Sequence, residues 1–196
     1  MLRRPEEVGQ TSADSNLRGS PSTGKTTLCE VLAKRLGLES AAYVREVARR
    51  IMREKGYSRD TIADLKMQLE IMEGHIEDEE RAIGAANLVL CDRSAIDPIV
   101  YAILDVAKQR QSTLLSHPAF ERALGRYCES ASIFILLAPV KSWVVDDGVR
   151  SIENQEECSE VFIQVLRDLG IPYRVLGSDC QSVYERMVLT LGQAYS

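Results

Sequence analysis

The sequence has no long hydrophobic run. Its longest apolar stretches, such as Ile133 to Ala138, fall far short of the roughly 20 residues that cross a bilayer. The first ten residues, MLRRPEEVGQ, contain basic side chains but no apolar stretch behind them to form a signal peptide. We therefore expect a cytoplasmic protein without a membrane span.

Cysteine pairs and a basic excess are also lacking. The five cysteines are an odd number, contain no CxxC pair and have no histidine at ligand spacing, so we expect free and mostly buried thiols. The net charge is −5, which provides no broad basic surface for nucleic acid. We expect no nucleic-acid partner, and the sequence leaves the oligomeric state open.

Short apolar runs that alternate with helical patterns are what the sequence does contain. The chain of 196 residues is 45% hydrophobic, which suits one domain with a sizeable core. Short apolar runs indicate strands, and a spacing of three to four residues indicates helices. This order predicts an α/β fold of three layers, α/β/α, around a parallel sheet. The expected strands are 41–44, 88–91, 133–137 and 173–176, all but the first buried, and the expected helices are 26–36, 62–83, one from Asp97, 156–169 and one from Ser182.

The strongest motif is GSPSTGKTT, which fits the phosphate-binding P-loop pattern GxxxxGK[ST] and leads into the first helix. Its backbone N–H groups can surround a phosphate, Lys25 can reach the β and γ phosphates, and the Thr26 hydroxyl can bind Mg²⁺. The alternative is a glycine-rich turn that only caps a helix. We predict that a nucleoside triphosphate binds to Gly19, Ser22, Thr23, Gly24, Lys25, Thr26 and Thr27.

A P-loop should follow a buried strand, yet the residues before Gly19 are SADSNLR, in which Leu17 is the only large apolar side chain. We therefore expect the first strand to be degenerate or missing. One explanation is an N-terminal segment that is not native to this domain, such as a mis-assigned start or exon, and we favour it over a degenerate strand. We accordingly predict an atypical segment at residues 1–18, which could be disordered, and a domain at residues 19–196.

The second motif is CDRS, residues 91–94, at the end of an expected buried strand and so at the edge of the sheet that carries ligands. Asp92 could accept the proton of an attacking hydroxyl or hold Mg²⁺ through water, and Arg93 could neutralise phosphate charge. The alternative is that Asp92 caps the next helix, although Asp97 before Pro98 suits that position better. We keep Asp92 and Arg93 as candidate catalytic residues and Asp92 as a candidate metal ligand.

Two weaker patterns complete the candidate site. WVVDDGVR, residues 143–150, has the features of a lid, in which Arg150 would neutralise the transferred phosphoryl group; a solvated helix face is the alternative. Arg45 and Glu46 follow the expected strand 41–44 and could reach an acceptor pocket, although a charged amphipathic helix explains them as well. Gln68, on the long helix, could also contact substrate.

Together these motifs resemble the P-loop kinases of nucleosides, and most of all the ribosylnicotinamide kinase domain of the bacterial NAD-regulatory protein and its eukaryotic AAA-like relatives. The resemblance extends from Gly19 to about Leu191 and depends on GSPSTGKTT, VREVAR, LEIMEGHIEDEERAI, CDRSAIDPIVYA and PVKSWVVDDGVR. It implies a P-loop NTPase fold, ATP and Mg²⁺ as cofactors, and action of Asp92 and Arg93 at the acceptor hydroxyl. It also implies that Glu46 lines the acceptor site.

Two functions follow as hypotheses. The first is ATP-dependent phosphoryl transfer to a hydroxyl of a small, nucleoside-like acceptor, with Lys25 and Arg150 as further catalytic residues. The second is a switch or regulatory module that binds ATP or GTP without metabolic kinase activity. A kinase consumes ATP only when an acceptor is present, whereas a switch binds or slowly hydrolyses nucleotide without one.

Overall fold

A single parallel sheet organises the chain. The computed structural model describes residues 13–18, 24–58, 64–104, 108–138, 152–180 and 182–194. The five strands lie in the order β2-β3-β1-β4-β5, and every neighbouring pair is parallel. The carboxyl ends of the strands therefore share one edge, as the predicted α/β class requires. The strands are β1 (Ala13–Arg18), β2 (Tyr43–Val44), β3 (Leu88–Asp92), β4 (Ser132–Leu137) and β5 (Tyr173–Leu176).

The first strand is present, so of the two predicted alternatives it is degenerate in sequence and not missing. β1 has the polar sequence ADSNLR and lies at the centre of the sheet, where Ala13 pairs with Leu88 of β3 and Asp14 pairs with Ser132 of β4. Backbone N–H and C=O groups make these pairings whatever the side chains are. Residues 13–18, which belong to the predicted atypical segment 1–18, form β1, and residues 1–12 lie outside the described residues. The predicted division between residues 1–18 and 19–196 stays a prediction.

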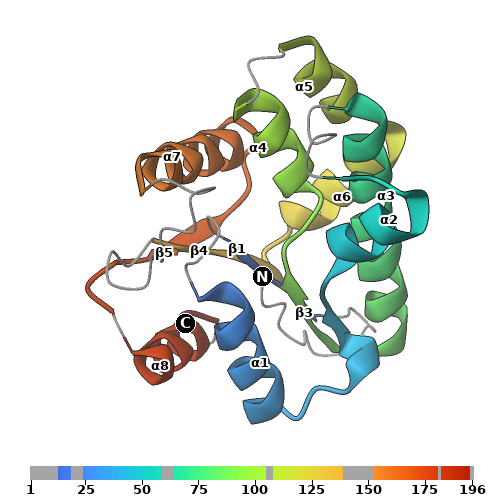
Figure 1. Cartoon of the computed structure of the whole chain (residues 1–196). Coiled ribbons are helices and arrows are strands. Elements are labelled where there is room, and N and C mark those ends of the chain that lie inside the picture. The colour runs from blue at the N-terminus through green and yellow to red at the C-terminus, as the bar shows by residue number, and fades with distance from the viewer. Residues whose placement is uncertain are drawn as a thin grey trace.

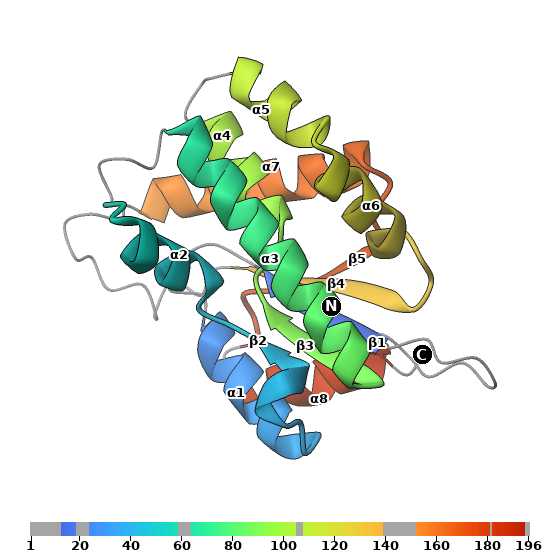
Figure 2. The same cartoon turned by 90° about the vertical axis from the view of Figure 1, so that its right-hand side faces the viewer.

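Helices cover both faces of the sheet (Figures 1 and 2). On one face lie α1 and α8, and on the other lie α2, α3, α4, α6 and α7, while α5 packs against α4 and α6. The predicted three-layer architecture is confirmed. The helices are α1 (Lys25–Arg35), α2 (Val47–Lys55), α3 (Leu65–Ala85), α4 (Ile96–Leu104), α5 (Lys108–Leu115), α6 (Pro118–Tyr127), α7 (Ile152–Asp168) and α8 (Val183–Ala194).

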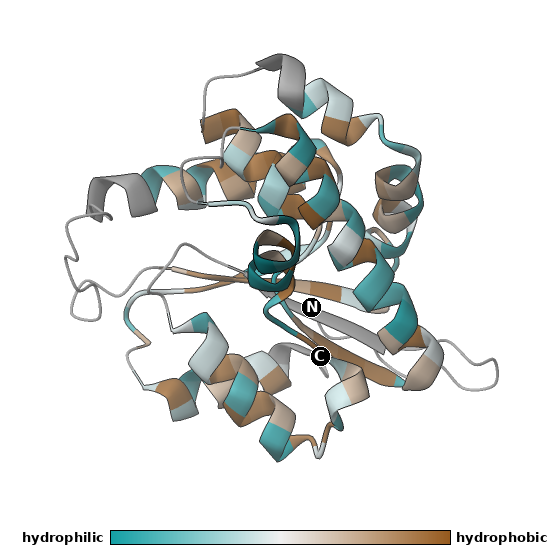
Figure 3. Cartoon of the chain, turned by 45° about the vertical axis from the view of Figure 1, so that its right-hand side comes forward, coloured by the Kyte–Doolittle hydropathy of each residue, from teal (hydrophilic) through white to brown (hydrophobic). Residues whose placement is uncertain are grey.

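The core follows from the alternation of side chains along β4. Phe134 and Leu136 pack under α4, α6 and α7, whereas Ile135 and Leu137 pack against α1 and α8. A strand that is apolar on both faces fits a sheet covered on both sides. Figure 3 shows this distribution, with brown on the strands and both teal and brown on the helices. No helix in the described residues is long and apolar enough to span a membrane.

Several element boundaries differ from the predicted ones. Only Tyr43 and Val44 form β2, because residues 40–42 make a 3-10 turn. β5 lies at the edge of the sheet with Arg174 and Val175 exposed, so the expectation of a buried strand is wrong there. The sequence reading also missed α5 and α6, although α6 starts with proline in its first turn, a common helix-start signal. The five cysteines are free as predicted, and Cys128 alone among them is exposed.

A buried polar contact joins α3 to α6. The hydroxyl of Tyr127 donates a hydrogen bond of 2.6 Å to Oε2 of Glu79, whose side chain is fully buried. The ring of Tyr127 also meets Phe134 of β4 edge-on, with centroids 5.1 Å apart. A buried carboxylate needs such donors, because burial of a charge without compensation costs several kcal/mol. This contact therefore helps to fix the helix layer on the sheet.

We predict that Tyr127→Phe lowers the free energy of unfolding by about 1 to 3 kcal/mol, because it removes a donor to a buried carboxylate while it keeps the aromatic ring. Urea denaturation measures the change. Tyr173→Phe is the matched control, since the Tyr173 hydroxyl accepts its hydrogen bond from Arg167 at an exposed position. The control should stay within about 0.5 kcal/mol of wild type. Equal losses in the two variants would contradict a special role for the Tyr127 contact.

Candidate functional site

The site begins where α1 follows the P-loop pattern. Gly24 precedes α1 with φ 76, in the left-handed region that glycine enters without strain, and its carbonyl accepts the first helical hydrogen bond from Leu28. This explains why the motif needs glycine directly before Lys25. Gly19, Ser22 and Thr23 lie outside the described residues, as do Trp143 and Arg150 of the predicted lid.

Lys25 is a buried cation at the start of α1. Only 5% of Lys25 is exposed, and burial lowers its pKa to about 7, with the nearby charge of Arg93 as the next contribution. The carboxylates of Asp92 and Asp97 oppose this shift. Thr26 and Thr27, which follow, are exposed at the first turn of the helix. The N-terminus of a helix carries a partial positive charge, which here lies beside Lys25.

Asp92 ends β3, the strand next to β1 on one side of the sheet. Its Oδ2 accepts a hydrogen bond of 2.7 Å from the Thr26 hydroxyl, across 66 residues of sequence. Asp92 is 6% exposed, and its Oδ1 is buried without a hydrogen-bond partner among the described residues. Asp92 does not cap the following helix, so the structural alternative considered for it is wrong. An acceptor oxygen in this position is suited to receive a ligand.

The donor set around Asp92 fits Mg²⁺. A threonine hydroxyl and a carboxylate supply hard oxygen atoms, and Mg²⁺ is commonly held by one or two such protein ligands together with water and substrate phosphates. The described residues contain no group of three or more His, Cys, Asp or Glu side chains that could hold a metal alone. The pair of Thr26 and Asp92 would therefore need the phosphates of a nucleotide to complete the coordination.

The turn after β3 carries Arg93 in an unusual conformation. Arg93 has φ 100, one of two positive values at non-glycine residues in the described chain. Its Nη1 donates to Oδ1 of Asp97 at 2.7 Å and to the hydroxyl of Tyr101 at 3.3 Å. Burial by itself would lower the pKa of Arg93, but Tyr101 and Asp97 raise it overall, so the guanidinium stays charged.

Asp97 lies inside α4, not at its cap as the sequence suggested. α4 starts at Ile96, whose N–H donates to the hydroxyl of Ser94, and Oδ2 of Asp97 accepts from the N–H of Ser94. Ser94 and Asp97 thus both accept backbone hydrogen bonds at the start of α4, in an arrangement similar to a capping box. Asp97 and Tyr101 are residues that the sequence did not indicate as parts of the site. They are four residues apart on α4 and so share one helix face, but Arg93 lies in the turn before the helix, where helical spacing does not apply.

The predicted acceptor residues lie in the link between β2 and α2 and on α3. Arg45 has its guanidinium 5.3 Å from the centre of the Tyr43 ring. Glu46 has φ 57, and its carboxylate is bound by Nη1 of Arg49 at 2.8 Å on the exposed surface. Gln68 is buried on α3. The role of these three side chains in an acceptor pocket stays a prediction.

Arg186, which the sequence did not indicate, binds backbone carbonyls at the carboxyl ends of β4 and β5. It is 1% exposed on α8, and its guanidinium donates to the carbonyls of Cys180, Ala138 and Gly177 at 2.8, 3.1 and 3.4 Å. These carbonyls follow β4 and β5, so one side chain joins the ends of two strands. A single arginine in the first turns of a helix has no sequence pattern that distinguishes it from an exposed one.

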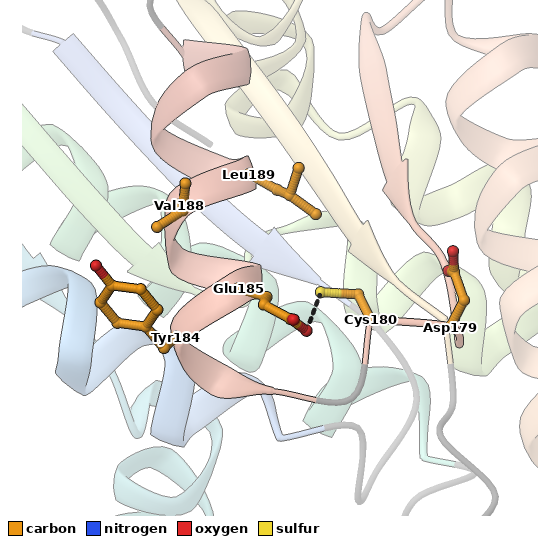
Figure 4. Close-up of a pocket in the computed structure, with 6 residues that line it drawn as sticks. All are labelled: Asp179, Cys180, Tyr184, Glu185, Val188 and Leu189. Carbon is orange, nitrogen blue, oxygen red and sulfur yellow. Dashed lines mark hydrogen bonds between the residues drawn. The ribbon is translucent and has the colours of Figure 1, made fainter.

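A separate groove lies on the outer face of α8 (Figure 4). It has a volume of about 410 Å³, and Tyr184, one of its lining residues, is 68% exposed. The thiol of Cys180 points to Glu185 across it, 3.9 Å from Oε2. None of the predicted site residues lines this groove. Its lining residues are Asp179, Cys180, Tyr184, Glu185, Val188 and Leu189.

Comparison with solved structures gives the same fold. The NadR protein in complex with NR matches with a TM-score of 0.74 and 23% identity, over 94% of this chain and 52% of that one. NadR with NAD and AMP-PNP matches with a TM-score of 0.72 and 22% identity, over 94% and 49%. The chain thus spans about half the length of these NadR chains. Deoxyadenosine kinase from M. mycoides with bound dATP matches with a TM-score of 0.64 and 16% identity, over 93% and 100%.

No curated protein matches the sequence. At these identities the likeness to solved structures shows the fold, which is the predicted P-loop fold of nucleoside-type kinases. A family model described as an AAA domain matches residues 15–186, which includes most of β1 and extends into α8. The match therefore covers the strand, helix and turn that carry Lys25, Thr26, Asp92 and Arg93, and the chain belongs to the AAA domain family.

Proposed function

We propose that this protein transfers the γ-phosphoryl group of ATP to a hydroxyl of a small, nucleoside-like acceptor. The observation that carries the proposal is the hydrogen bond between Thr26 and Asp92, which unites the P-loop helix with the end of β3. Lys25 and Arg93 lie beside this pair, near enough for the charge of Arg93 to lower the pKa of Lys25. Two cations and a magnesium-type oxygen pair at one strand edge suit a triphosphate.

In the proposed reaction, the acceptor oxygen forms a bond to the γ-phosphorus while the bond from that phosphorus to the β-γ bridging oxygen breaks. ADP leaves, and the proton of the hydroxyl passes to a base or to water. Lys25 and Arg93 would stabilise the charge on the phosphoryl oxygens, and Thr26 and Asp92 would hold Mg²⁺. Magnesium bound there supplies charge neutralisation at the β and γ phosphates.

Two further assignments belong to the proposal. Asp92 has one oxygen on Thr26, which favours the metal-holding role over the role of general base, although Oδ1 could still meet an acceptor hydroxyl. Arg150 would neutralise the transferred group from the lid, and Glu46, Arg45 and Gln68 would line the acceptor pocket. The likeness to NadR bound to NR and to deoxyadenosine kinase supports a nucleoside-like acceptor.

The deciding experiment incubates the protein with labelled ATP, Mg²⁺ and a panel of nucleosides, ribosylnicotinamide and related alcohols. We expect a phosphorylated product with at least one acceptor and little loss of ATP without any. Binding of ATP or GTP with slow hydrolysis and no phosphorylated acceptor would contradict the proposal and favour a nucleotide-dependent switch.

Lys25→Ala should abolish the protection that ATP gives in a thermal-shift assay, because the variant lacks the cation at the phosphate site. In wild type, ligand at 100 times its dissociation constant stabilises a protein by about 2.7 kcal/mol. Lys34→Ala is the matched control, since Lys34 lies exposed at the far end of the same helix. Protection that persists in Lys25→Ala would remove this helix start from the proposed site.

Asp92→Asn should lower the rate of transfer by at least about a hundredfold while the protein still binds nucleotide. The metal-holding role predicts, in addition, that saturation requires a higher Mg²⁺ concentration in the variant. The role of general base predicts an unchanged Mg²⁺ requirement. Asp168→Asn, at the end of α7 and the opposite edge of the sheet, should match wild type in both measurements. Transfer that survives intact would make Asp92 a structural residue.

A further inference from the structure

Arg93 is held in a backbone conformation that an L residue rarely adopts. A non-glycine residue in the left-handed region costs on the order of 1 to 3 kcal/mol and persists only where its surroundings fix it. Arg93 enters this region directly after β3, with φ 100, at the ligand-bearing end of the strand. The contacts that keep it there therefore determine where its guanidinium lies.

Asp97 fixes this turn through both oxygens of one buried carboxylate. Oδ1 accepts from Nη1 of Arg93 at 2.7 Å, and Oδ2 accepts from the backbone N–H of Ser94 at 3.0 Å. One oxygen thus holds the side chain of Arg93, and the other holds the peptide that follows it. Asp97 is itself part of α4, which packs against α3 and α7, so its position is set by the helix layer.

Tyr101 adds a second contact one helical turn further along α4. Its hydroxyl oxygen accepts from the same Nη1 of Arg93 at 3.3 Å. Asp97 and Tyr101 are four residues apart and so lie on one face of the helix. Together they engage one end of the guanidinium. The fork of an arginine has five donors, so the same side chain can also donate to phosphate oxygens.

We propose that Asp97 and Tyr101 are positioning residues, which hold the Arg93 guanidinium beside Lys25 so that it binds the phosphate oxygens of a nucleotide. The inference rests on the proposed function, since it assigns the phosphate site to this edge of the sheet. It extends that function by two residues of α4 that do not themselves contact the phosphate. Three observations concern Arg93. Its backbone is left-handed, the Asp97 carboxylate binds both its side chain and the next peptide, and its Nη1 donates to Asp97 and to Tyr101.

A positioning role and a purely electrostatic role of Asp97 predict opposite changes in nucleotide affinity when its charge is removed. Asp97→Asn removes a negative charge near a site for anions, so electrostatics alone predicts tighter binding of a triphosphate. The positioning role predicts weaker binding, because the guanidinium loses the carboxylate that orients it. The two explanations therefore predict opposite shifts in the dissociation constant.

The test measures the affinity of the whole protein for AMP-PNP with Mg²⁺ by titration calorimetry. We expect Asp97→Asn to weaken binding roughly tenfold and Tyr101→Phe roughly threefold, within the range of coupling energies between contacting residues. In an Arg93→Ala background, Asp97→Asn should change the affinity by less than about twofold, because the side chain that it positions is gone. Urea denaturation of each variant reports on folding.

Two matched substitutions serve as controls. Asp78→Asn removes a carboxylate that binds Arg50 and Arg81 elsewhere, and Tyr173→Phe removes a hydroxyl at the opposite end of the sheet. Both should leave the affinity within about twofold of wild type. Should Asp97→Asn prove too unstable to study, Tyr101→Phe with and without Arg93→Ala gives the same cycle.

Tighter binding in Asp97→Asn, or an equal loss with and without Arg93, would overturn the positioning role. Failure of the proposed function gives a different result. Wild-type protein that binds AMP-PNP but phosphorylates no acceptor contradicts phosphoryl transfer, whereas the double-mutant cycle of binding affinities can still be measured. Wild type that does not bind AMP-PNP at all would overturn both.

Discussion

The hydrogen bond between Thr26 and Asp92 is the contact on which the rest of the site depends. It requires β1 and β3 to be neighbours, because only then does the helix after one strand start beside the end of the other. The sheet order therefore decides the chemistry, since a change in the order of the strands would separate the hydroxyl from the carboxylate. The helix layers on the two faces hold that order in place, because side chains of β3 pack against helices on both faces of the sheet.

The charges at this edge explain why the site suits an anion. Lys25 and Arg93 repel each other, and burial makes the charged form of Lys25 costly, which is why its pKa falls to about 7. Phosphate oxygens between the two cations would offset both penalties, because a negative charge close to both favours their charged forms. Binding of a triphosphate should therefore raise the pKa of Lys25 and stabilise the folded chain at the same time.

The sequence predicted the elements whose signals are local. The start of α1, the strand at Leu88 to Cys91 and the ends of α7 and β5 follow, to within a residue, from periodicity, glycine and apolar runs. Contacts across the fold could not be predicted in this way. Nothing near Arg93 in the sequence shows that its backbone is left-handed or that Asp97 binds it. The contacts of Arg186 with three carbonyls depend on where two distant strands end.

The polar sequence of β1 is a further case in which contacts across the fold decide the structure. Hydrophobic periodicity reports how side chains are buried, but a parallel strand is held by backbone hydrogen bonds that every residue except proline can make. With β3 on one side and β4 on the other, the segment ADSNLR has partners for both of its backbone edges. Both neighbours are apolar strands that pack against helices, so their positions are fixed and the segment between them can pair with both. The position of the P-loop helix at the strand edge then follows from the pairing of β1, not from the hydrophobicity of its sequence.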